Sequence, residues 1–209
     1  MVVPLKPLAR AKSRLARAAG EDARPRLALA FAQDTVAAAL ACSRVRDVVV
    51  VTDDAVAAAA LSALGARIVP DAPGAGLNAA LAHGARSVRA LRPAAAVAAL
   101  NADLPALRTG ELARVLDFAS AFPNAFLRDA AGIGTTFLAA VSGAEFRPAF
   151  GGPSGARHLA SGAVEIALSG VDSVRRDVDT GEDLRVALAL GVGSHTARIA
   201  TAPAPSRDR

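Results

Sequence analysis

The sequence Asp47-Val48-Val49-Val50-Val51-Thr52 sets the architecture, because four consecutive valines between polar residues are typical of a buried β-strand. Residues 54–64 follow with a helical pattern that stops at Gly65, a residue type suited to ending a helix. Residues 66–69 are apolar again and predict a further strand. A strand, a helix and a second strand in this order predict two parallel strands joined by a crossover helix.

The same alternation continues on both sides of this unit. Apolar runs predict strands at residues 1–5 and 94–100. Helices are expected at residues 25–41, from the glycine-bearing loop at residues 74–78 to residue 91, and at residues 109–120. The first half of the chain therefore predicts a mostly parallel sheet with helices on both faces.

The second half of the chain has a different pattern. Residues 125–127 and 135–141 predict two strands with no helix between them, and residues 164–168 and 174–178 predict two more. A short helix is expected within residues 151–162, and a last helix at residues 179–190. We therefore predict one α/β domain over residues 1–190 with a mixed sheet, followed by a weakly structured tail at residues 191–209.

Composition limits the classes of function. The 209 residues contain one cysteine, Cys42, which excludes an internal disulfide framework. No apolar stretch is long enough for a membrane span or a signal peptide, so a cytoplasmic location is expected. The formal net charge is +5, but the arginines are dispersed and aromatic residues make up 3% of the chain. We therefore expect no nucleic-acid partner, and a basic nucleic-acid-binding module remains the non-enzymatic alternative.

Basic residues are concentrated in the loop after the first predicted strand. Of the 24 basic residues only Lys6 and Lys12 are lysine, and Arg14 follows closely. Ligands of open α/β sheets bind beyond the carboxyl ends of the strands, where this loop lies. Its cations suit a polyphosphate, although a solvated basic loop would look the same.

Three aspartates are candidate metal ligands. Asp103 follows a buried strand, and a carboxylate fixed there suits Mg²⁺. Asp177 and Asp179 alternate in Asp177-Val178-Asp179, at the end of a predicted strand, so they should share one face. The alternatives are that Asp103 caps a turn and that Asp179 caps the last helix.

Glycine- and hydroxyl-bearing loops supply further candidates. Gly151 and Ser154 could hold a phosphate or carboxylate, although Ser154 could also cap a short helix. Thr136 brings a hydroxyl to the start of a strand, while Gly76 and Asn78 lie in a turn that could approach a nucleotide. The three histidines, His83, His158 and His195, show no ligand spacing, and no catalytic role is predicted for them.

Six of these segments resemble the phospholactate/phosphoenolpyruvate guanylyltransferases of coenzyme F-420 biosynthesis. The matching motifs occur in the family's order between residue 2 and about residue 190. They are VPLKPLARAKSRL (3–15), GLNAA (76–80), ADLPAL (102–107), GTT (134–136), FGGPS (150–154) and DVDTGEDL (177–184). The resemblance implies a three-layer, Rossmann-like nucleotidyltransferase fold of the molybdenum-cofactor guanylyltransferase type.

The resemblance also implies the reaction and its residues. GTP would be the donor, magnesium the cofactor and phosphoenolpyruvate the acceptor, with 2-phospho-L-lactate or 3-phosphoglycerate as alternatives. A nucleotidyltransferase for a sugar phosphate or molybdopterin is a more distant alternative. The implied residue sets are Lys12 and Asp103 for catalysis; Lys6, Lys12, Arg14, Gly76 and Asn78 for GTP; Thr136, Gly151 and Ser154 for the acceptor; and Asp103, Asp177 and Asp179 for the metal. A downstream transferase would take the product, and a homodimer is a further expectation.

The chemistry requires no general base. A phosphate ester is already ionised near neutral pH, since its second pKa is about 6. Attack on the α-phosphate of GTP then needs charge neutralisation and in-line positioning, which cations and fixed loops can supply.

Overall fold

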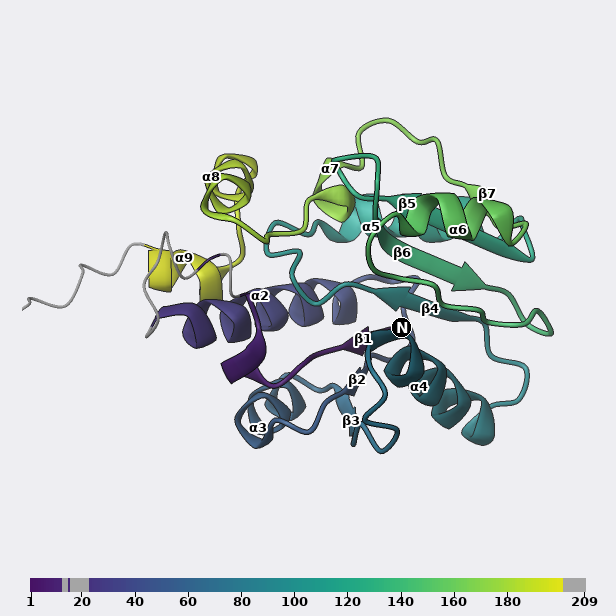
Figure 1. Cartoon of the computed structure of the whole chain (residues 1–209), viewed down its shortest axis with the longest axis horizontal. Coiled ribbons are helices and arrows are strands. Elements are labelled where there is room, and N and C mark those ends of the chain that lie inside the picture. Colours follow the sequence, from purple (N-terminus) through teal and green to yellow (C-terminus); the bar gives the residue numbers. More distant parts are fainter. Residues whose placement is uncertain (13–14, 16–22, 201–209) are drawn as a thin grey trace, which may run out of the picture.

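A computed structural model describes residues 1–12, 15 and 23–200. Within these residues seven strands form one mixed sheet in the order β3-β2-β1-β4-β6-β5-β7 (Figure 1). The strands are β1 (Val2–Pro4), β2 (Val49–Val51), β3 (Arg67–Val69), β4 (Val97–Leu100), β5 (Asn124–Arg128), β6 (Thr135–Ala140) and β7 (Val164–Glu165). β1 is parallel to β2 and β4, and β2 to β3, whereas β6 runs antiparallel to β4 and β5. The predicted mixed, mostly parallel sheet is confirmed.

Helices cover both faces of the sheet. One apolar cluster joins the sheet to α2 (Ala23–Leu40), α3 (Ala55–Ala63), α5 (Thr109–Ala119) and α7 (Asp172–Arg175). A second cluster, on the opposite face, joins it to α4 (Leu77–Leu91). The short helix α6 (Ser154–Ala160) lies on this same face, because its His158 packs on Phe126 of the second cluster. This three-layer arrangement is the one that the alternating sequence pattern predicts.

The valine-rich strands supply both clusters. Val50 packs in the first cluster, while its neighbours Val49 and Val51 pack in the second, as expected where successive side chains point to opposite faces. Gly84 lets α4 lie directly on the sheet, because a Cβ there would lie 2.6 Å from a methyl of Val2. The middle of α4 is thereby held against Val2 of β1 and Val51 of β2.

Residues 174–178, predicted as a strand, are not one. Asp172–Arg175 form the helical turn α7, and the following residues pair with no strand of the sheet. The buried residues here are Val171, Ser173, Val174 and Val178, and the valines among them are spaced by three and four, as in a helix, rather than alternating. β7 is also shorter than the predicted run over residues 164–168.

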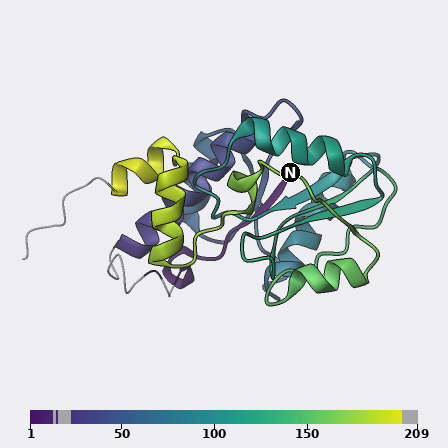
Figure 2. The same cartoon turned by 90° about the horizontal axis from the view of Figure 1, so that it is seen from above.

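The carboxyl-terminal part of the described chain forms two helices beside α2. They are α8 (Gly181–Leu190) and α9 (Ser194–Ala200), and Figure 2 shows them at one end of the molecule. The buried carboxylate of Asp34 on α2 accepts hydrogen bonds from the backbone amides of His195 (3.0 Å) and Thr196 (2.8 Å). Residues 194–200 thus differ from the weakly structured tail expected after residue 190, because Asp34 caps a helix there.

None of the helices within residues 1–12, 15 and 23–200 combines the length and hydropathy needed to cross a lipid bilayer.

Candidate active site

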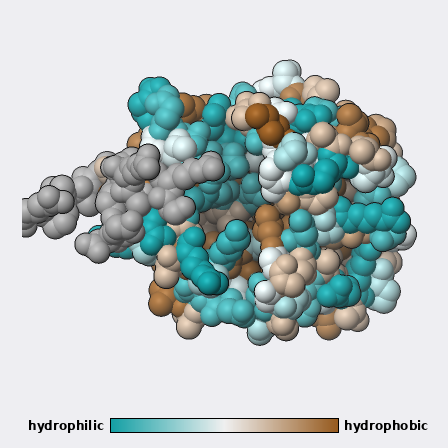
Figure 3. All heavy atoms as spheres, viewed as in Figure 1, coloured by the Kyte–Doolittle hydropathy of each residue, from teal (hydrophilic) through white to brown (hydrophobic). Residues whose placement is uncertain are grey.

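A cavity of about 560 Å³ lies at the carboxyl ends of β1 and β4, where an open α/β sheet binds its ligands. Figure 3 shows a hollow bordered mostly by hydrophilic residues on this face of the molecule. Seven of the residues predicted to form the site line the cavity: Lys6, Lys12, Asp103, Gly151, Ser154, Asp177 and Asp179. Gly76, Asn78 and Thr136 are not part of this lining, and Arg14 lies outside the described residues.

Lys12 is held in an unusual backbone conformation at the edge of the cavity. Its φ is 56°, and it is the one non-glycine residue with positive φ in the described part of the chain. Such a conformation is costly for a residue with a Cβ and is often found at functional sites. The preceding loop is tied down by the Arg24 guanidinium, which donates to the carbonyl oxygens of Ala9 (2.9 Å) and Ala11 (2.5 Å).

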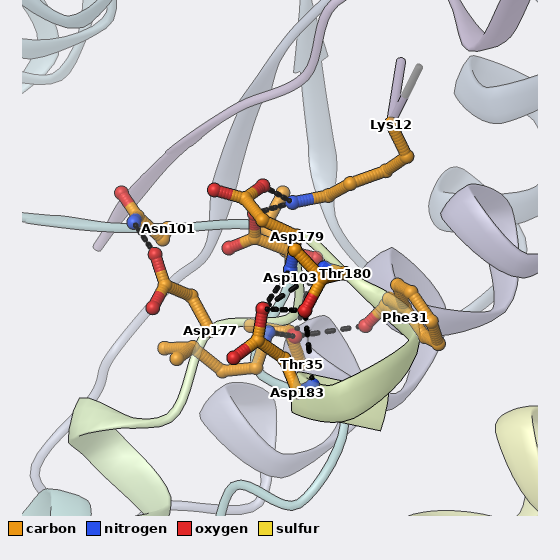
Figure 4. Close-up of polar contacts among 11 residues, drawn as sticks. Lys12, Phe31, Thr35, Asn101, Asp103, Asp177, Asp179, Thr180 and Asp183 are labelled. Carbon is orange, nitrogen blue, oxygen red and sulfur yellow. Dashed lines mark hydrogen bonds and ion pairs between the residues drawn. The ribbon is translucent and has the colours of Figure 1, made fainter. Parts of the chain in front are cut away.

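The Lys12 ammonium lies between two of the predicted metal-binding carboxylates (Figure 4). Its Nζ donates to Oδ2 of Asp103 in a short contact and to Oδ1 of Asp179 at 2.6 Å. The Lys12 side chain is 11% exposed. Burial alone would lower the pKa of Lys12, but the charges of Asp103 and Asp179 outweigh burial and raise it well above its ordinary value. The ammonium therefore stays charged at neutral pH.

A backbone bond brings the acidic residues together without the predicted strand. The amide of Val178 donates to the carbonyl oxygen of Asp103 at 3.0 Å, which places Asp177 and Asp179 beside the loop after β4. Asp179 does not cap α8, the helix predicted at residues 179–190. Thr180 caps α8 in a reciprocal pair with Asp183, and Asp179 is left to contact Lys12.

Asp103, Asp177 and Asp179 form an acidic wall of the cavity, and Asp177 lies deeper in it than the other two. Nδ2 of Asn101 is 3.5 Å from its Oδ2 (Figure 4). Burial, followed by the charges of Asp103 and Asp179, raises the pKa of Asp177 to about 7. Oδ1 of Asp103 is also buried and has no hydrogen-bond partner among the described residues. Lys12 alone therefore neither fills all the hydrogen-bond acceptors of the acidic wall nor neutralises its charge.

The three aspartates do not form a complete metal site by themselves. In the described part of the chain no three His, Cys, Asp or Glu side chains gather closely enough to hold one ion. Magnesium binding by Asp103, Asp177 and Asp179 therefore stays a prediction, with the number of ions open. A cation here would need further oxygen ligands from a bound molecule, as Mg²⁺ ordinarily takes from phosphates and water.

The opposite wall is built around a β-bulge. Leu127 pairs with Phe137 and Arg128 with Thr135, so Thr136 is the extra residue in β6. A bulge of this kind turns a side chain to a new direction, and here Thr135 lines the cavity. Thr136 is fully buried, and its Oγ1 has no hydrogen-bond partner among the described residues. Strict alternation along the strand could not reveal this change of face.

Ser154 and the glycines before it complete this wall. Ser154 Oγ donates to Thr135 Oγ1 at 3.0 Å and makes no helix cap, so the alternative that it caps α6 is wrong. Gly151 and Gly152 have φ values of 95° and 48°, which suit glycine. The loop that they form lines the same cavity as Lys12, Asp103 and Asp179.

Asn78 holds this loop rather than lining the cavity. Its Nδ2 donates to the carbonyl oxygen of Phe150 (3.1 Å), and its Oδ1 accepts from the amide of Phe150 (2.8 Å). Both ends of the side-chain amide are therefore engaged by the backbone. Gly76 is the N-cap residue of α4 with a φ of 94°.

Asp129 and His158 belong to the site or its surroundings but were not predicted from the sequence. Asp129 lines the cavity and closes the turn between β5 and β6, because its carboxylate accepts from the amides of Ile133 and Gly134. His158 is fully buried behind Thr135. The spacing of Asp129 and Gly134 across a predicted turn could have indicated the first, whereas nothing local indicates the second.

This arrangement defines a class of protein. A mostly parallel sheet with a basic loop after β1, an acidic loop after β4 and a glycine-bearing loop at residues 151–154, all lining one cavity, fits a nucleotidyltransferase. A solved structure from Desulfovibrio desulfuricans G20, assigned as a nucleotide-diphospho-sugar transferase, superposes with a TM-score of 0.70 at 16% identity, over 94% of this chain and 91% of that one. Rv0371C of Mycobacterium tuberculosis in complex with manganese gives a TM-score of 0.52 at 21% identity, over 90% and 97% of the two chains.

The sequence comparisons narrow the class to one family. The family model described as guanylyl transferase CofC like matches residues 1–200, so the chain belongs to the CofC-like guanylyltransferase family. A relative from Streptomyces avermitilis, named phosphoenolpyruvate guanylyltransferase, is 68% identical over 212 residues, which cover 100% of this chain and 98% of that protein. The resemblance inferred from the six motifs is confirmed.

Proposed function

We propose that this enzyme condenses phosphoenolpyruvate with GTP to give enolpyruvyl-2-diphospho-5'-guanosine and pyrophosphate, as a step of coenzyme F-420 biosynthesis. The observation that carries the proposal is one cavity in which the Lys12–Asp103–Asp179 cluster faces the loop of Gly151 and Ser154. The name of the Streptomyces relative, at 68% identity over the whole chain, supports the same reaction.

The reaction needs little covalent chemistry from the protein. An oxygen of the acceptor phosphate attacks the α-phosphorus of GTP, a new phosphoanhydride bond forms, and the bond to the β-phosphate oxygen breaks to release pyrophosphate. No proton has to be removed, because the acceptor phosphate is already ionised near neutral pH. Catalysis then consists of bringing two anions together and stabilising the charge of the leaving pyrophosphate.

Lys12 is suited to this task. Its permanently charged ammonium lies at the boundary between the basic loop after β1 and the acidic wall. We assign it to the α-phosphate and the departing pyrophosphate, with Lys6 and Arg14 at the outer phosphates. On the acceptor side we assign Gly151 and Ser154, together with the hydroxyl of Thr135, which takes the place expected for Thr136.

The acidic wall fits a divalent ion in its chemistry. Carboxylate oxygens are the ligands that Mg²⁺ prefers, and the buried Oδ1 of Asp103 lacks a partner among the described residues. We propose that Asp103 and Asp179 hold magnesium together with phosphate oxygens, and that Asp177 acts from behind them. When bound, the ion would offset negative charge on the reacting phosphates. The manganese complex of the distant structural relative is compatible with such use.

Kinetics with varied substrates test the proposal. Pyrophosphate release is measured with GTP, CTP or UTP, each combined with phosphoenolpyruvate, 2-phospho-L-lactate or 3-phosphoglycerate. We expect GTP with phosphoenolpyruvate to give the highest kcat/KM. A preference for CTP or UTP, or inactivity with every acceptor, would contradict the assignment.

A matched pair of variants tests the site. Asp103→Asn removes a charge in the cavity and should lower kcat by about a hundredfold or more, since this carboxylate contacts Lys12 and would hold the metal beside the reacting phosphates. Asp117→Asn removes a charge from an exposed ion pair with Arg44 and should leave kcat unchanged. Equal activities of the two variants would remove Asp103 from the site.

The surroundings of the reaction follow from its chemistry. The product is an activated phosphoanhydride, and we propose that a downstream transferase accepts it in the cytoplasm, where both substrates are made. A homodimer stays a prediction.

A further inference from the structure

Behind the wall formed by Thr135 and Ser154 lies a histidine for which no catalytic role was predicted. His158, on α6, is fully buried, and its ring packs against Phe126 and edge-on against Phe150, with centroids 5.6 Å and 5.3 Å away. Both of its ring nitrogens are engaged. The backbone amide of Ala149 donates to Nε2 at 3.0 Å, and Nδ1 lies 3.0 Å from Oγ1 of Thr135.

These contacts fix the proton on the ring. A backbone amide can only donate, so Nε2 must be the unprotonated nitrogen. Burial, and secondarily the charge of Arg157, lowers the pKa of His158 to about 4, and the ring is therefore neutral at pH 7. A neutral ring that is bare at Nε2 carries its proton on Nδ1, which must then donate to Thr135 Oγ1.

The tautomer determines how many hydroxyl protons face the ligand. Thr135 and Ser154 both line the cavity, and one hydroxyl proton is used in the bond between them. Because the histidine donates to Thr135, the second hydroxyl proton of the pair is left for a bound molecule. With the opposite tautomer Thr135 would have to donate to Nδ1, and the pair would have no proton left to offer.

We propose that His158 is a positioning residue that sets the Thr135–Ser154 hydroxyl pair as a hydrogen-bond donor to an anionic group of the acceptor. It does not touch the reacting atoms; it acts through Thr135 and through its hold on Ala149, at the start of the acceptor loop. The adjacent Arg157 strengthens this hold, because its guanidinium donates to the carbonyl oxygens of Ala149 and Gly151. This inference rests on the proposed function for the identity of the acceptor.

Two substitutions of His158 separate its two bonds. The amide nitrogen of His158→Asn reaches as far as Nδ1 does and can still donate to Thr135, whereas the longer side chain of His158→Gln places its oxygen near the Nε2 position and keeps only the link to Ala149. We expect His158→Gln to raise the KM for the acceptor by roughly tenfold or more, with the KM for GTP unchanged. His158→Asn should stay within roughly threefold of the wild type.

Variants of Thr135 test the same link from its other end. Thr135→Val should raise the acceptor KM as His158→Gln does, Thr135→Ser should restore it, and the double variant should be no worse than either single one. His195→Gln, on α9 and away from the cavity lining, is the matched control and should behave as the wild type. Equal rises in the KM for GTP and for the acceptor, or additive losses in the double variant, would overturn the proposal.

A measurement without turnover separates this inference from the proposed function. The ¹⁵N shifts of the His158 ring report its tautomer directly, and we expect a neutral ring protonated at Nδ1 at pH 7. A ring protonated at Nε2 would overturn the inference even in an active enzyme. If the wild type uses no acceptor, the proposed function fails, while the ring shifts still decide the tautomer.

Discussion

Asn78 offers a sharp distinction between a nucleotide ligand and a support for the acceptor loop. Its motif implies contact with GTP, but in the structure its amide makes two hydrogen bonds to the backbone of Phe150, at 2.8 and 3.1 Å. Phe150 is buried, so Asn78→Ala leaves its amide and carbonyl without those partners. Each neutral hydrogen bond contributes about 1 kcal/mol, so the variant loses about 2 kcal/mol of the free energy that stabilises the ordered loop.

That free energy converts into a substrate-specific effect. If ordering of the loop is needed only for the acceptor, 2 kcal/mol corresponds to a rise of roughly thirtyfold in the acceptor KM. Initial rates of pyrophosphate release, with each substrate varied in turn, give both KM values. Asn78→Asp keeps the bond to the Phe150 amide and should have a smaller effect, while Asn124→Ala, on β5, is the control. A rise in the KM for GTP with an unchanged acceptor KM would refute the reasoning.

Three further predictions concern charge, pH and stability. Lys12→Arg keeps the charge but should lower kcat by about tenfold, because a planar guanidinium cannot replace a compact ammonium between Asp103 and Asp179; an unchanged kcat would argue against this role. The unfolded chain binds a proton at His158 below about pH 6.5, whereas the folded chain resists it down to about pH 4. Stability should therefore fall as pH drops through this window, by an amount of the order of 2 to 3 kcal/mol in urea titrations, and His158→Asn should flatten the slope; parallel slopes would contradict the low pKa. Asp34→Ala should cost about 2 kcal/mol of unfolding free energy, because it removes the cap of α9, and a variant as stable as the wild type would show that α9 contributes little.

The architecture could be predicted from the sequence because the buried strands have a clear hydrophobic pattern. The valines of β2 and the apolar run of β4 are buried on both faces, which leaves an unbroken hydrophobic pattern. The sequence-based prediction failed at residues 174–178, where two buried valines four residues apart were interpreted as part of a strand. Asp177 and Asp179 nevertheless line the cavity together, because the bond from Val178 to Asp103, rather than a shared strand face, brings them there.

The candidate site divides in the same way. Lys12 lies in the loop after β1 and Asp103 in the loop after β4, and these strands are parallel neighbours, so topology predicts both residues at the same edge of the sheet. Thr135 and His158 depend on tertiary features that no local pattern encodes, namely a bulge in β6 and a buried ring behind it. Outside the site, the cap that Asp34 provides likewise joins segments 161 residues apart in the chain. Asn78 was expected to contact GTP, but both ends of its side-chain amide are hydrogen-bonded to the backbone of Phe150, in the loop next to the cavity.

The most direct test of the central claim follows oxygen through the reaction. Phosphoenolpyruvate labelled with ¹⁸O in its phosphate is incubated with GTP, magnesium and the wild-type protein. The masses of the guanosine adduct and of pyrophosphate are then measured by mass spectrometry. If the acceptor phosphate attacks the α-phosphorus, the guanosine adduct retains all of the label and the pyrophosphate carries none. Release of GMP without an adduct, or of labelled pyrophosphate, would contradict the proposed guanylyl transfer.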